Sequence, residues 1–424
     1  MDSSAPRSPN PWRWIPTLYF SQGIPYVVVM TLSVVMYKNL AVSNTDIALY
    51  TSWLYLPWVI KPLWSPAVDL VRTKRFWIVG LQLVVGAALA AVALVIPGPD
   101  FFRATLAVFW LLAFSSATHD IAADGFYLLA LPSHHQAAFV GVRSTFYRLA
   151  MIGGQGGLVY LAGSLQTVAG GVAQAWSWVF GVTAAFFFLA GLYHGFVLPR
   201  PAGDGPVAAN AQPVAAYFEV FAAFFRKKQI GIVLAFLLLY RLAEAQLLKL
   251  VTPFLLDART AGGLALTTKE VGIVYGTIGI IALTLGGLVG GYVISRFGLK
   301  RLLWPMILTM HTPNVVFIFL ALFQPTNLVV VGGALAIEQF GYGFGFTAYM
   351  LYMMLVAEGE HRTAHYAICT GFMALGMMLP GMAAGWIQEQ LGYVNFFIWV
   401  CIAAIPSLFV TACVKVDPAF GKKA

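Results

Sequence analysis

The sequence predicts an all-α polytopic membrane protein with twelve transmembrane helices arranged as two six-helix halves. Three observations carry this prediction: the composition, the spacing of the apolar stretches and the placement of the basic residues. Of the 424 residues, 60% are hydrophobic and only 10% are charged, and the mean hydropathy is +0.81. A soluble domain carries about 25% charged residues because its surface faces water. Most of the surface of this chain must therefore face lipid.

Apolar stretches long enough to cross a bilayer as helices recur along the chain. The first six lie at residues 14–37, 46–68, 76–97, 103–131, 136–162 and 175–198. A polar segment follows, and residues 214–228 within it are typical of a short amphipathic helix that ends in three basic residues. Six more apolar stretches lie at residues 229–256, 267–295, 302–323, 327–356, 362–387 and 393–414.

These stretches divide the chain into two related halves. Residues 1–198 form the expected N-terminal half, residues 199–228 a cytoplasmic linker and residues 229–424 the C-terminal half. An offset of 226 residues aligns the basic pair after the second span with the pair after the eighth, and also aligns the fifth span with the eleventh. Two such halves, repeated in parallel about an axis along the membrane normal, are typical of the major facilitator fold.

The basic residues predict the orientation of the chain. With both termini in the cytoplasm, sixteen of the 25 Lys and Arg residues fall in cytoplasmic segments and four on the opposite side. This bias follows the positive-inside rule and predicts a multi-pass protein of the bacterial inner membrane. The net charge of +9 does not indicate a nucleic-acid partner, because the basic residues form no continuous face. All three cysteines lie in apolar stretches, so no disulfide framework is expected.

Ionisable residues inside the spans are costly to insert and are functional hypotheses by default. From the second span to the tenth they are Lys61, Asp120, Asp124, Arg143, Arg148, Arg241, Glu244, Lys249 and Glu338. Asp120 and Asp124 are four residues apart and share one face of the fourth span. In the major facilitator plan the first, fourth, seventh and tenth spans line a central cavity. All four carboxylates fall on three of those spans.

A buried carboxylate without a partner can hold a proton at neutral pH, which a proton-coupled carrier needs. The predicted substrate-binding or proton-coupling residues are Asp120, Asp124, Glu244, Glu338, Gln339, Arg148 and Arg241. The carboxylates would bind protons or sugar hydroxyls, and the two arginines would attract substrate carboxylates. The alternative is a set of structural ion pairs, for instance Asp124 with Arg148 or Arg241 with Glu244.

A loop motif predicts a gate on the cytoplasmic side. The loop from Gly291 to Arg301 is similar to the facilitator signature of glycine, an acid with an arginine, and a basic pair. The first-half copy keeps the acid as Asp69, whereas the second half has Ser295 there. An acid at a helix end can pair with a neighbouring arginine and latch that side shut, and the alternative is plain anchoring by positive charge. The predicted gating residues are Asp69, Arg72, Arg75 and Lys61.

Glycine clusters occur in three spans. Those at residues 153–157 and 286–291 predict close approach of neighbouring helices. The denser cluster at residues 341–345 predicts either the same packing or a hinge in the tenth span below Glu338.

No catalytic or metal-binding motif accompanies these residues. The sequence has no HExxH, no nucleotide-binding loop and no Ser/His/Asp set. The pair of Asp120 and Asp124 is faintly similar to the aspartates of membrane prenyl- and phosphotransferases, but the further aspartates that magnesium needs are missing nearby. The sequence therefore predicts a transporter with no enzyme activity, no bound metal and no cofactor.

More specific motifs resemble those of the AmpG-type permeases, the peptide–acetyl-coenzyme A branch of the major facilitators. The matching segments are 61–66 with Asp69, 120–124, 147–151, 241–244, 253–255, 338–339 and 384–386. The seventh span of that family carries Lys-Leu-x-Asp, where this chain has Arg241 and Glu244. The resemblance covers nearly the whole chain. It implies a proton-driven importer of anhydro-muropeptides, which are peptidoglycan fragments that carry N-acetylglucosamine.

The sequence thus predicts a proton-coupled secondary importer of anhydro-muropeptides or similar amphiphilic glycoconjugates across the inner membrane. The expected partners are that small molecule, protons and the lipid bilayer, with no nucleic acid, and the chain is expected to act as a monomer. The first alternative is a siderophore or oligosaccharide permease of the same fold. A transporter-like sensor would bind ligand without flux, and an intramembrane transferase would release a modified product.

Overall fold

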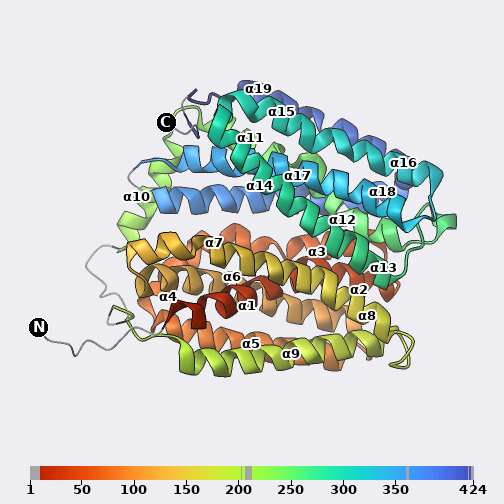
Figure 1. Ribbon diagram of the computed structural model, residues 1–424, viewed down its shortest axis with the longest axis horizontal. Coiled ribbons are helices and arrows are strands. Elements are labelled where there is room, and N and C mark those ends of the chain that lie inside the picture. The colour runs from red at the N-terminus through yellow and green to blue at the C-terminus, as the bar shows by residue number, and fades with distance from the viewer. Residues whose placement is uncertain (1–9, 202, 206–212, 360–361, 419, 422–424) are drawn as a thin grey trace, which may run out of the picture.

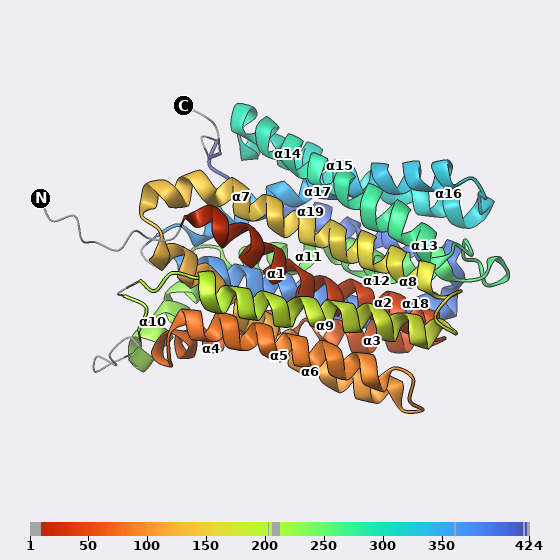
Figure 2. The ribbon, with the colours of Figure 1, turned by 60° about the horizontal axis from the view of Figure 1, so that its bottom comes forward.

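The computed structural model describes residues 10–201, 203–205, 213–359, 362–418 and 420–421. Within these ranges every regular element is a helix and no strand occurs. Figure 1 shows the helices lying side by side along the length of the molecule, and Figure 2 shows the same arrangement after a turn of 60°. The fold is therefore all-helical, as the composition and the apolar stretches predict.

The first six predicted spans each coincide with a helical rod, and some rods consist of several consecutive elements. These elements are η1 (Pro11–Arg13), α1 (Ile15–Val27), η2 (Val28–Leu32) and α2 (Ser33–Asn39); α3 (Asn44–Trp53) and α4 (Leu56–Leu70); α5 (Lys74–Val95); α6 (Phe101–Ala130); α7 (Ser133–Met151), η3 (Ile152–Leu158) and α8 (Val159–Leu165); and α9 (Val172–Val197). The stretches η2 and η3 are turns of π-helix that continue the rods on either side of them.

The linker helix and the last six spans follow in the same way. Their elements are α10 (Pro213–Phe225); α11 (Ile230–Leu239) and α12 (Leu242–Leu256); η4 (Arg259–Ala261); α13 (Thr268–Val271), η5 (Gly272–Gly279) and α14 (Ile280–Phe297); α15 (Leu299–His311), η6 (Thr312–Asn314) and α16 (Val315–Phe323); α17 (Leu328–Ala357); α18 (Arg362–Ala403); and α19 (Ile405–Cys413).

The long element α18 is two spans joined at Gly392. An unbroken helix of 42 residues would be ~63 Å long, about twice the hydrocarbon core of a bilayer. Gly392 has φ 71° and ψ 167°, a conformation that glycine adopts without strain, and the helix breaks there. The eleventh and twelfth predicted spans meet at this residue.

Nine segments of the described chain are long and apolar enough to cross a membrane, and the last of them, Ala364–Cys413, contains the break at Gly392. Two further rods, α3–α4 and α7–α8, are more polar or interrupted, yet they lie in the bundle with the others. Large apolar side chains cover the outside of the bundle, for example Leu94, Phe196 and Val329, each more than 80% exposed. Together these features confirm the prediction of a twelve-span membrane protein.

Side-chain caps fix several helix starts. The hydroxyl of Ser43 accepts from the backbone of α3, that of Thr73 from α5, and the amide oxygen of Asn327 from α17. Thr267 and Glu270 form a capping box at α13, in which each side chain accepts from the other residue's backbone N–H. These caps define where the polar loops end and the spans begin.

The rods form two groups. Figure 1 shows α1–α9 on one side of the molecule and α11–α19 on the other, with α10 at one end. The chain begins α1 and ends α19 at that same end, which we call the terminal end. The other end, which we call the opposite end, carries α2, α8, α13 and α16.

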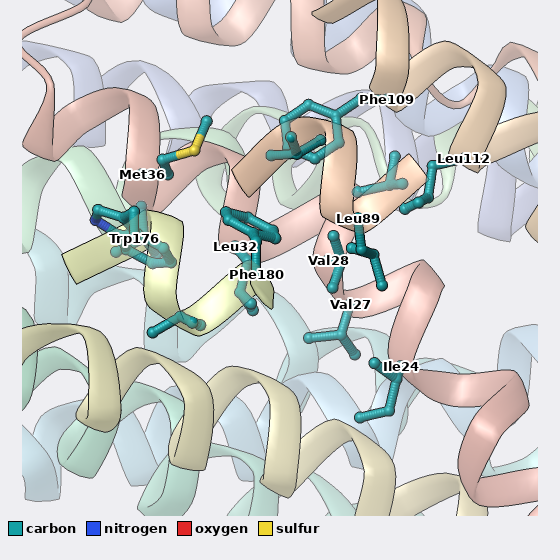
Figure 3. Close-up of a cluster of buried hydrophobic side chains, with 14 of the residues drawn as sticks. Ile24, Val27, Val28, Leu32, Met36, Leu89, Phe109, Leu112, Trp176 and Phe180 are labelled. Carbon is teal, nitrogen blue, oxygen red and sulfur yellow. The ribbon is translucent and has the colours of Figure 1, made fainter. Parts of the chain in front are cut away.

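The apolar core of the first group surrounds the first span, as Figure 3 shows. Its labelled residues are Ile24, Val27, Val28, Leu32, Met36, Leu89, Phe109, Leu112, Trp176 and Phe180, from α1, η2, α2, α5, α6 and α9. All of them are buried. Because lipid is as apolar as these side chains, close packing rather than exclusion of water favours such contacts. The first span therefore packs against α5, α6 and α9 of its own half on this side, and other residues of it line the cavity.

Glycines allow neighbouring rods to touch at the backbone. A Cβ on Gly286 of α14 would overlap the carbonyl oxygen of Phe340, and a Cβ on Gly343 of α17 would overlap that of Leu283. The packing predicted for these clusters is therefore present. In this conformation α17 runs unbroken through residues 341–345, whose faces pack against α14 and α15, and the hinge alternative stays a prediction.

The two groups meet along two seams. One joins η3 to η5, where a Cβ on Gly276 would overlap the carbonyl oxygen of Gln155. The other joins α3 and α4 to α18, where Gly371 would place a Cβ 2.8 Å from the carbonyl oxygen of Val59. A cavity lies between the seams.

Candidate functional site

The cavity has a volume of about 670 Å³ and is lined by both groups of rods. Its walls come from α1, η2, α2, α4, α6, α7, η3, α12, η5, α14, α17 and α18. Lining residues reach close to the helix ends at the terminal end: Leu128 lies two residues before the end of α6, and Tyr366 lies four residues after the start of α18. The cavity thus extends to the terminal end.

Aromatic side chains form much of the wall. Tyr26, Tyr55, Trp58, Tyr275, Tyr342 and Tyr366 all line the cavity. The rings of Tyr26 and Trp58 meet edge to face with 5.4 Å between their centroids. Flat rings with a polar tip suit ligands that are apolar on one face and hydrogen-bonding at the rim, as sugars are.

Two cations of α12 line the same cavity. The guanidinium of Arg241 donates to the hydroxyl of Tyr342 and lies over the ring of Phe346, 4.8 Å from its centroid. Lys249 lies two turns further along the helix, and its ammonium donates to Thr51. Both side chains are almost fully buried, at 6% and 5% exposure. Between them Ala245 and Leu248 give the wall an apolar surface.

The two aspartates of α6 each contact a base. Asp120 lies behind the cavity wall, 3.7 Å from the ammonium of Lys61, and accepts a hydrogen bond of 3.3 Å from the indole N–H of Trp58. Asp124 lines the cavity and binds the guanidinium of Arg143 at 2.8 Å. Lys61 itself lines the cavity.

The ion pair expected between Asp124 and Arg148 is wrong. Arg143 is the base that faces Asp124, and its guanidinium also lies over the rings of Tyr19 and Tyr127, at 4.5 and 5.1 Å from their centroids. Arg148 instead donates to Thr284 of α14 at 3.2 Å and does not line the cavity. The rotation of α7 about its own axis turns Arg143 to α6 and Arg148 to the other half.

The ion pair between Arg241 and Glu244, which the structural alternative named, is also not formed. Arg241 faces the cavity, whereas Glu244 points away from it into the second half and is fully buried. There its Oε1 accepts from Asn314 at 3.1 Å and lies 3.3 Å from Nδ1 of His311. Its Oε2 has no hydrogen-bond partner among the described residues.

Glu338 of α17 is the other fully buried carboxylate of the second half. Its Oε2 accepts from the side chain of Gln339 at 2.9 Å, and its Oε1 lacks a hydrogen-bond partner in the described part of the chain. Gln339 lines the cavity and Glu338 does not. Glu244 is close enough to interact electrostatically with Glu338. Two carboxylates thus lie in one apolar region with His311 as the nearest described base.

The predicted gating residues are in different situations. The side chain of Asp69 lies outside the part that the structure describes, so the latch stays a prediction. The guanidinium of Arg72 lies over Phe76, and that of Arg75 donates to the carbonyl of Gly195. Asp204 of the linker accepts from the first backbone N–H groups of α5, which fastens the linker to the first half.

At the opposite end, polar side chains join the two groups of rods. We call Lys38, Asn44, Asp257, Gln388 and Tyr393 the opposite-end cluster. The ammonium of Lys38 lies 2.5 Å from Asp257, Tyr393 donates to Asp257 at 2.6 Å, and Asn44 donates to Gln388 at 2.7 Å. These contacts hold the two groups of rods together at the opposite end.

Sequence reasoning missed the opposite-end cluster, His311 and Asn314. The cluster residues lie at span ends, where polar side chains are ordinary, and the members from the first half are more than 200 residues away from those of the second. His311 and Asn314 did carry a signal, because they are polar residues within the ninth span.

Comparisons with known proteins agree with this architecture. The family model described as Major Facilitator Superfamily matches residues 17–379. The anhydromuropeptide permease of Escherichia coli (strain K12) is 26% identical over 401 residues, which cover 93% of this chain and 77% of the relative. The putative transporter AmpG 4 of Rickettsia conorii is 25% identical and covers 92% of each chain. The resemblance to AmpG-type permeases is confirmed, and these relatives are transporters rather than enzymes.

Solved structures share the fold at low sequence identity. The D-xylose–proton symporter matches with a TM-score of 0.69 at 12% identity, over 97% of this chain and 99% of that chain. A bacterial homologue of the human lysosomal transporter Spinster, in an inward-facing and unoccupied conformation, matches with a TM-score of 0.68 at 15% identity over 94% of each chain. The nucleoside transporter NupG matches with a TM-score of 0.66 at 16% identity, over 94% and 96%.

Proposed function

The chain belongs to the major facilitator superfamily, and from that premise we propose that it is a proton-coupled importer of anhydro-muropeptides or similar amphiphilic glycoconjugates. In this proposal it resides in the bacterial inner membrane as a monomer with both termini in the cytoplasm. The terminal end then faces the cytoplasm, and the cavity is open inward. Residues 1–198 and 229–424 rock about the substrate, and the opposite-end cluster separates when the outward side opens.

The observation that supports the substrate class best is the cavity wall around Arg241. A guanidinium matches a carboxylate in geometry and charge, and this one faces the cavity with no acidic partner among the described residues. Aromatic rings surround it. The volume of about 670 Å³ lies in the range of small-molecule sites and suits a short glycopeptide. A muropeptide presents what this wall can bind, namely sugar rings and carboxylates.

The buried carboxylates support proton coupling. One oxygen of Glu338 has no hydrogen-bond partner, and no Lys or Arg pairs with this side chain among the described residues. Binding a proton therefore neutralises it at the lowest cost in free energy in an apolar region. Its neighbour Gln339 lines the cavity, so the charge of Glu338 is one side chain away from the substrate. Asp120 is a second candidate, because it lies directly behind Trp58 and Lys61 of the wall. The described residues contain no cluster of His, Cys, Asp and Glu that could hold a metal ion.

Transport into proteoliposomes tests the proposal. We expect the purified full-length protein to accumulate a labelled N-acetylglucosaminyl-anhydro-N-acetylmuramyl tripeptide when the outside is acidic, and a protonophore to abolish the accumulation. Accumulation that follows a sodium gradient and ignores the protonophore would overturn proton coupling. Uptake of a ferric siderophore or a neutral oligosaccharide, with none of the muropeptide, would favour the alternative permease. Binding without flux would indicate a sensor, and a chemically altered product a transferase.

A further inference from the structure

Lys249 is a buried cation that the proposed function does not yet use. Its ammonium donates to Oγ1 of Thr51 at 3.0 Å and lies 5.2 Å from the centroid of the Tyr55 ring. Thr51 and Tyr55 belong to the second span, so Lys249 reaches across from the second half. No carboxylate lies within ion-pairing distance of it among the described residues.

The cations that line the cavity differ in whether the protein supplies an opposite charge. Lys61 lines the cavity beside Asp120 and is thus partly neutralised within the protein. Arg241 and Lys249 both line the cavity without an acidic partner in the described chain. A hydroxyl and a ring face compensate a buried ammonium only in part, because a full charge in an apolar wall needs an opposite charge. An anionic group of a ligand would supply that charge.

The spacing of the two cations defines what such a ligand looks like. Arg241 and Lys249 are eight residues apart on one rod, which corresponds to about 12 Å along a helix axis. Between them the wall is apolar, with Ala245 and Leu248, and tyrosines face it from the other rods. The site therefore fits an elongated molecule with an anionic group near each end and an apolar or ring-shaped middle.

We propose that Arg241 and Lys249 form a two-point anion site that binds two carboxylates of one substrate. This inference rests on the proposed function and narrows it to substrates with at least two anionic groups. Arg241 binds the carboxylate of a singly charged ligand, because its planar guanidinium offers two parallel donors. Lys249 binds the second carboxylate and selects muropeptides that still carry a peptide over the bare disaccharide.

Binding measurements on the full-length protein with two probes test this. The first probe is N-acetylglucosaminyl-anhydro-N-acetylmuramic acid, which has one carboxylate, and the second is the same disaccharide with an acidic tripeptide. We expect Lys249→Met to weaken binding of the tripeptide probe about 10- to 100-fold, which is the loss of a hydrogen bond to a charged group, and to leave the disaccharide probe within about twofold. Lys249→Arg keeps the charge and should retain most of the tripeptide affinity. Arg241→Met should weaken both probes.

The outcomes separate the two proposals. The two-point site is wrong if Lys249→Met lowers the affinity for both probes equally or for neither. It is also wrong if Lys249→Arg loses as much affinity for the tripeptide probe as Lys249→Met does. In each case Lys249 only holds the second half to Thr51. If the wild-type protein binds neither probe, the proposed substrate class itself is wrong, and the two-point site for muropeptides falls with it. The thermal midpoint of each variant in detergent shows whether it is folded.

Discussion

The two halves neutralise their carboxylates in different ways. In the first half, Asp120 and Asp124 lie beside Lys61 and Arg143, whose charges are permanent at physiological pH. In the second half, Glu244 and Glu338 have no Lys or Arg within ion-pairing distance among the described residues, and the nearest base is His311. The basic side chains Arg241 and Lys249 of that half line the cavity instead.

This difference bears on which carboxylates stabilise the fold and which can bind protons during transport. A permanent cation beside a carboxylate favours its ionised form, more at the 2.8 Å contact of Asp124 with Arg143 than at the 3.7 Å contact of Asp120 with Lys61. A carboxylate beside a histidine has a partner whose charge itself depends on a proton. The second half therefore has buried carboxylates on one side of α12 and cavity-lining cations on the other, and in our proposal the first bind protons and the second bind substrate. Arg241 is the N-cap of α12 and Glu244 lies in its first turn. The residue proposed to bind substrate is therefore only three positions from a residue that can bind a proton.

The largest effect is expected from Glu338→Gln, which fixes the carrier in its neutral form. A proton gradient of about two pH units supports roughly 100-fold accumulation for each proton carried with the substrate. The variant should lose this accumulation and equilibrate the substrate, while exchange of labelled for unlabelled substrate continues. Glu219→Gln is the matched control, because Glu219 is an exposed residue of α10 that pairs with Arg226. Retained accumulation in Glu338→Gln would place the proton site elsewhere.

The second prediction compares the stability of one acid–base pair from each half. His311→Leu removes the base that lies 3.3 Å from the fully buried Glu244, and breaking a buried pair of charged groups costs about 3–5 kcal/mol. Lys61→Met should cost about 1 kcal/mol or less, because Asp120 keeps the indole N–H of Trp58 and its partner is 28% exposed. Thermal unfolding in detergent measures both.

The double variant His311→Leu with Glu244→Gln sharpens the comparison. It removes the buried charge together with its base, so we expect part of the lost stability to return. If the double variant is no more stable than His311→Leu alone, packing rather than charge explains the loss. The two halves would then not differ in the way that we infer.

The third prediction concerns Asp124, whose side chain is 44% exposed. Because solvent screens such a pair, Asp124→Asn should lower the free energy of unfolding by about 1 kcal/mol or less. Arg143 keeps its contacts with the rings of Tyr19 and Tyr127 in that variant. In a double-mutant cycle Asp124→Asn should couple to Arg143→Gln and not to Arg148→Gln. Coupling to Arg148 would contradict the geometry of α7.

The spans could be predicted from the sequence because each is a long apolar stretch bounded by polar residues. The sequence could not predict which charged side chains pair with one another. Arg143 and Arg148 lie on the same span, and only the rotation of α7 against α6 decides which of them faces Asp124. Likewise, the sequence places Arg241 and Glu244 three residues apart, which would put them on one face of an unbroken helix. Arg241 instead precedes α12 with non-helical φ −108° and ψ 20°, so it faces the cavity while Glu244 points into the second half.

The opposite-end cluster shows a second limit. Asn44 and Gln388 form a hydrogen bond across 344 positions of the chain, and nothing local to either residue indicates the other. Such contacts depend on how two complete halves dock. By contrast, close packing at Gly286 and Gly343 could be predicted, since small residues in spans have the same consequence wherever they meet.

The smallest effect is expected in the loop motif, where the two halves also differ in charge. The first half has Asp69 at the position where the second half has Ser295, and a serine cannot form an ion pair with an arginine. Ser295 donates to the carbonyl of Tyr292 in its own helix, at 2.7 Å, which is a contact that stabilises no gate. If Asp69 latches the terminal end by its charge, Asp69→Asn should slow transport about two- to threefold, which corresponds to ~0.5 kcal/mol for an exposed ion pair. Ser295→Ala should leave the rate unchanged.

Both variants are tested by measuring the rate of counterflow in proteoliposomes at low and at high salt. Salt screens ion pairs, so high salt should reduce the difference in rate between Asp69→Asn and the wild type. Equal slowing by the two substitutions would show that the loop acts by packing. The charge of Asp69 would then have no role in gating, and the functional difference between the halves would be confined to the residues around the cavity.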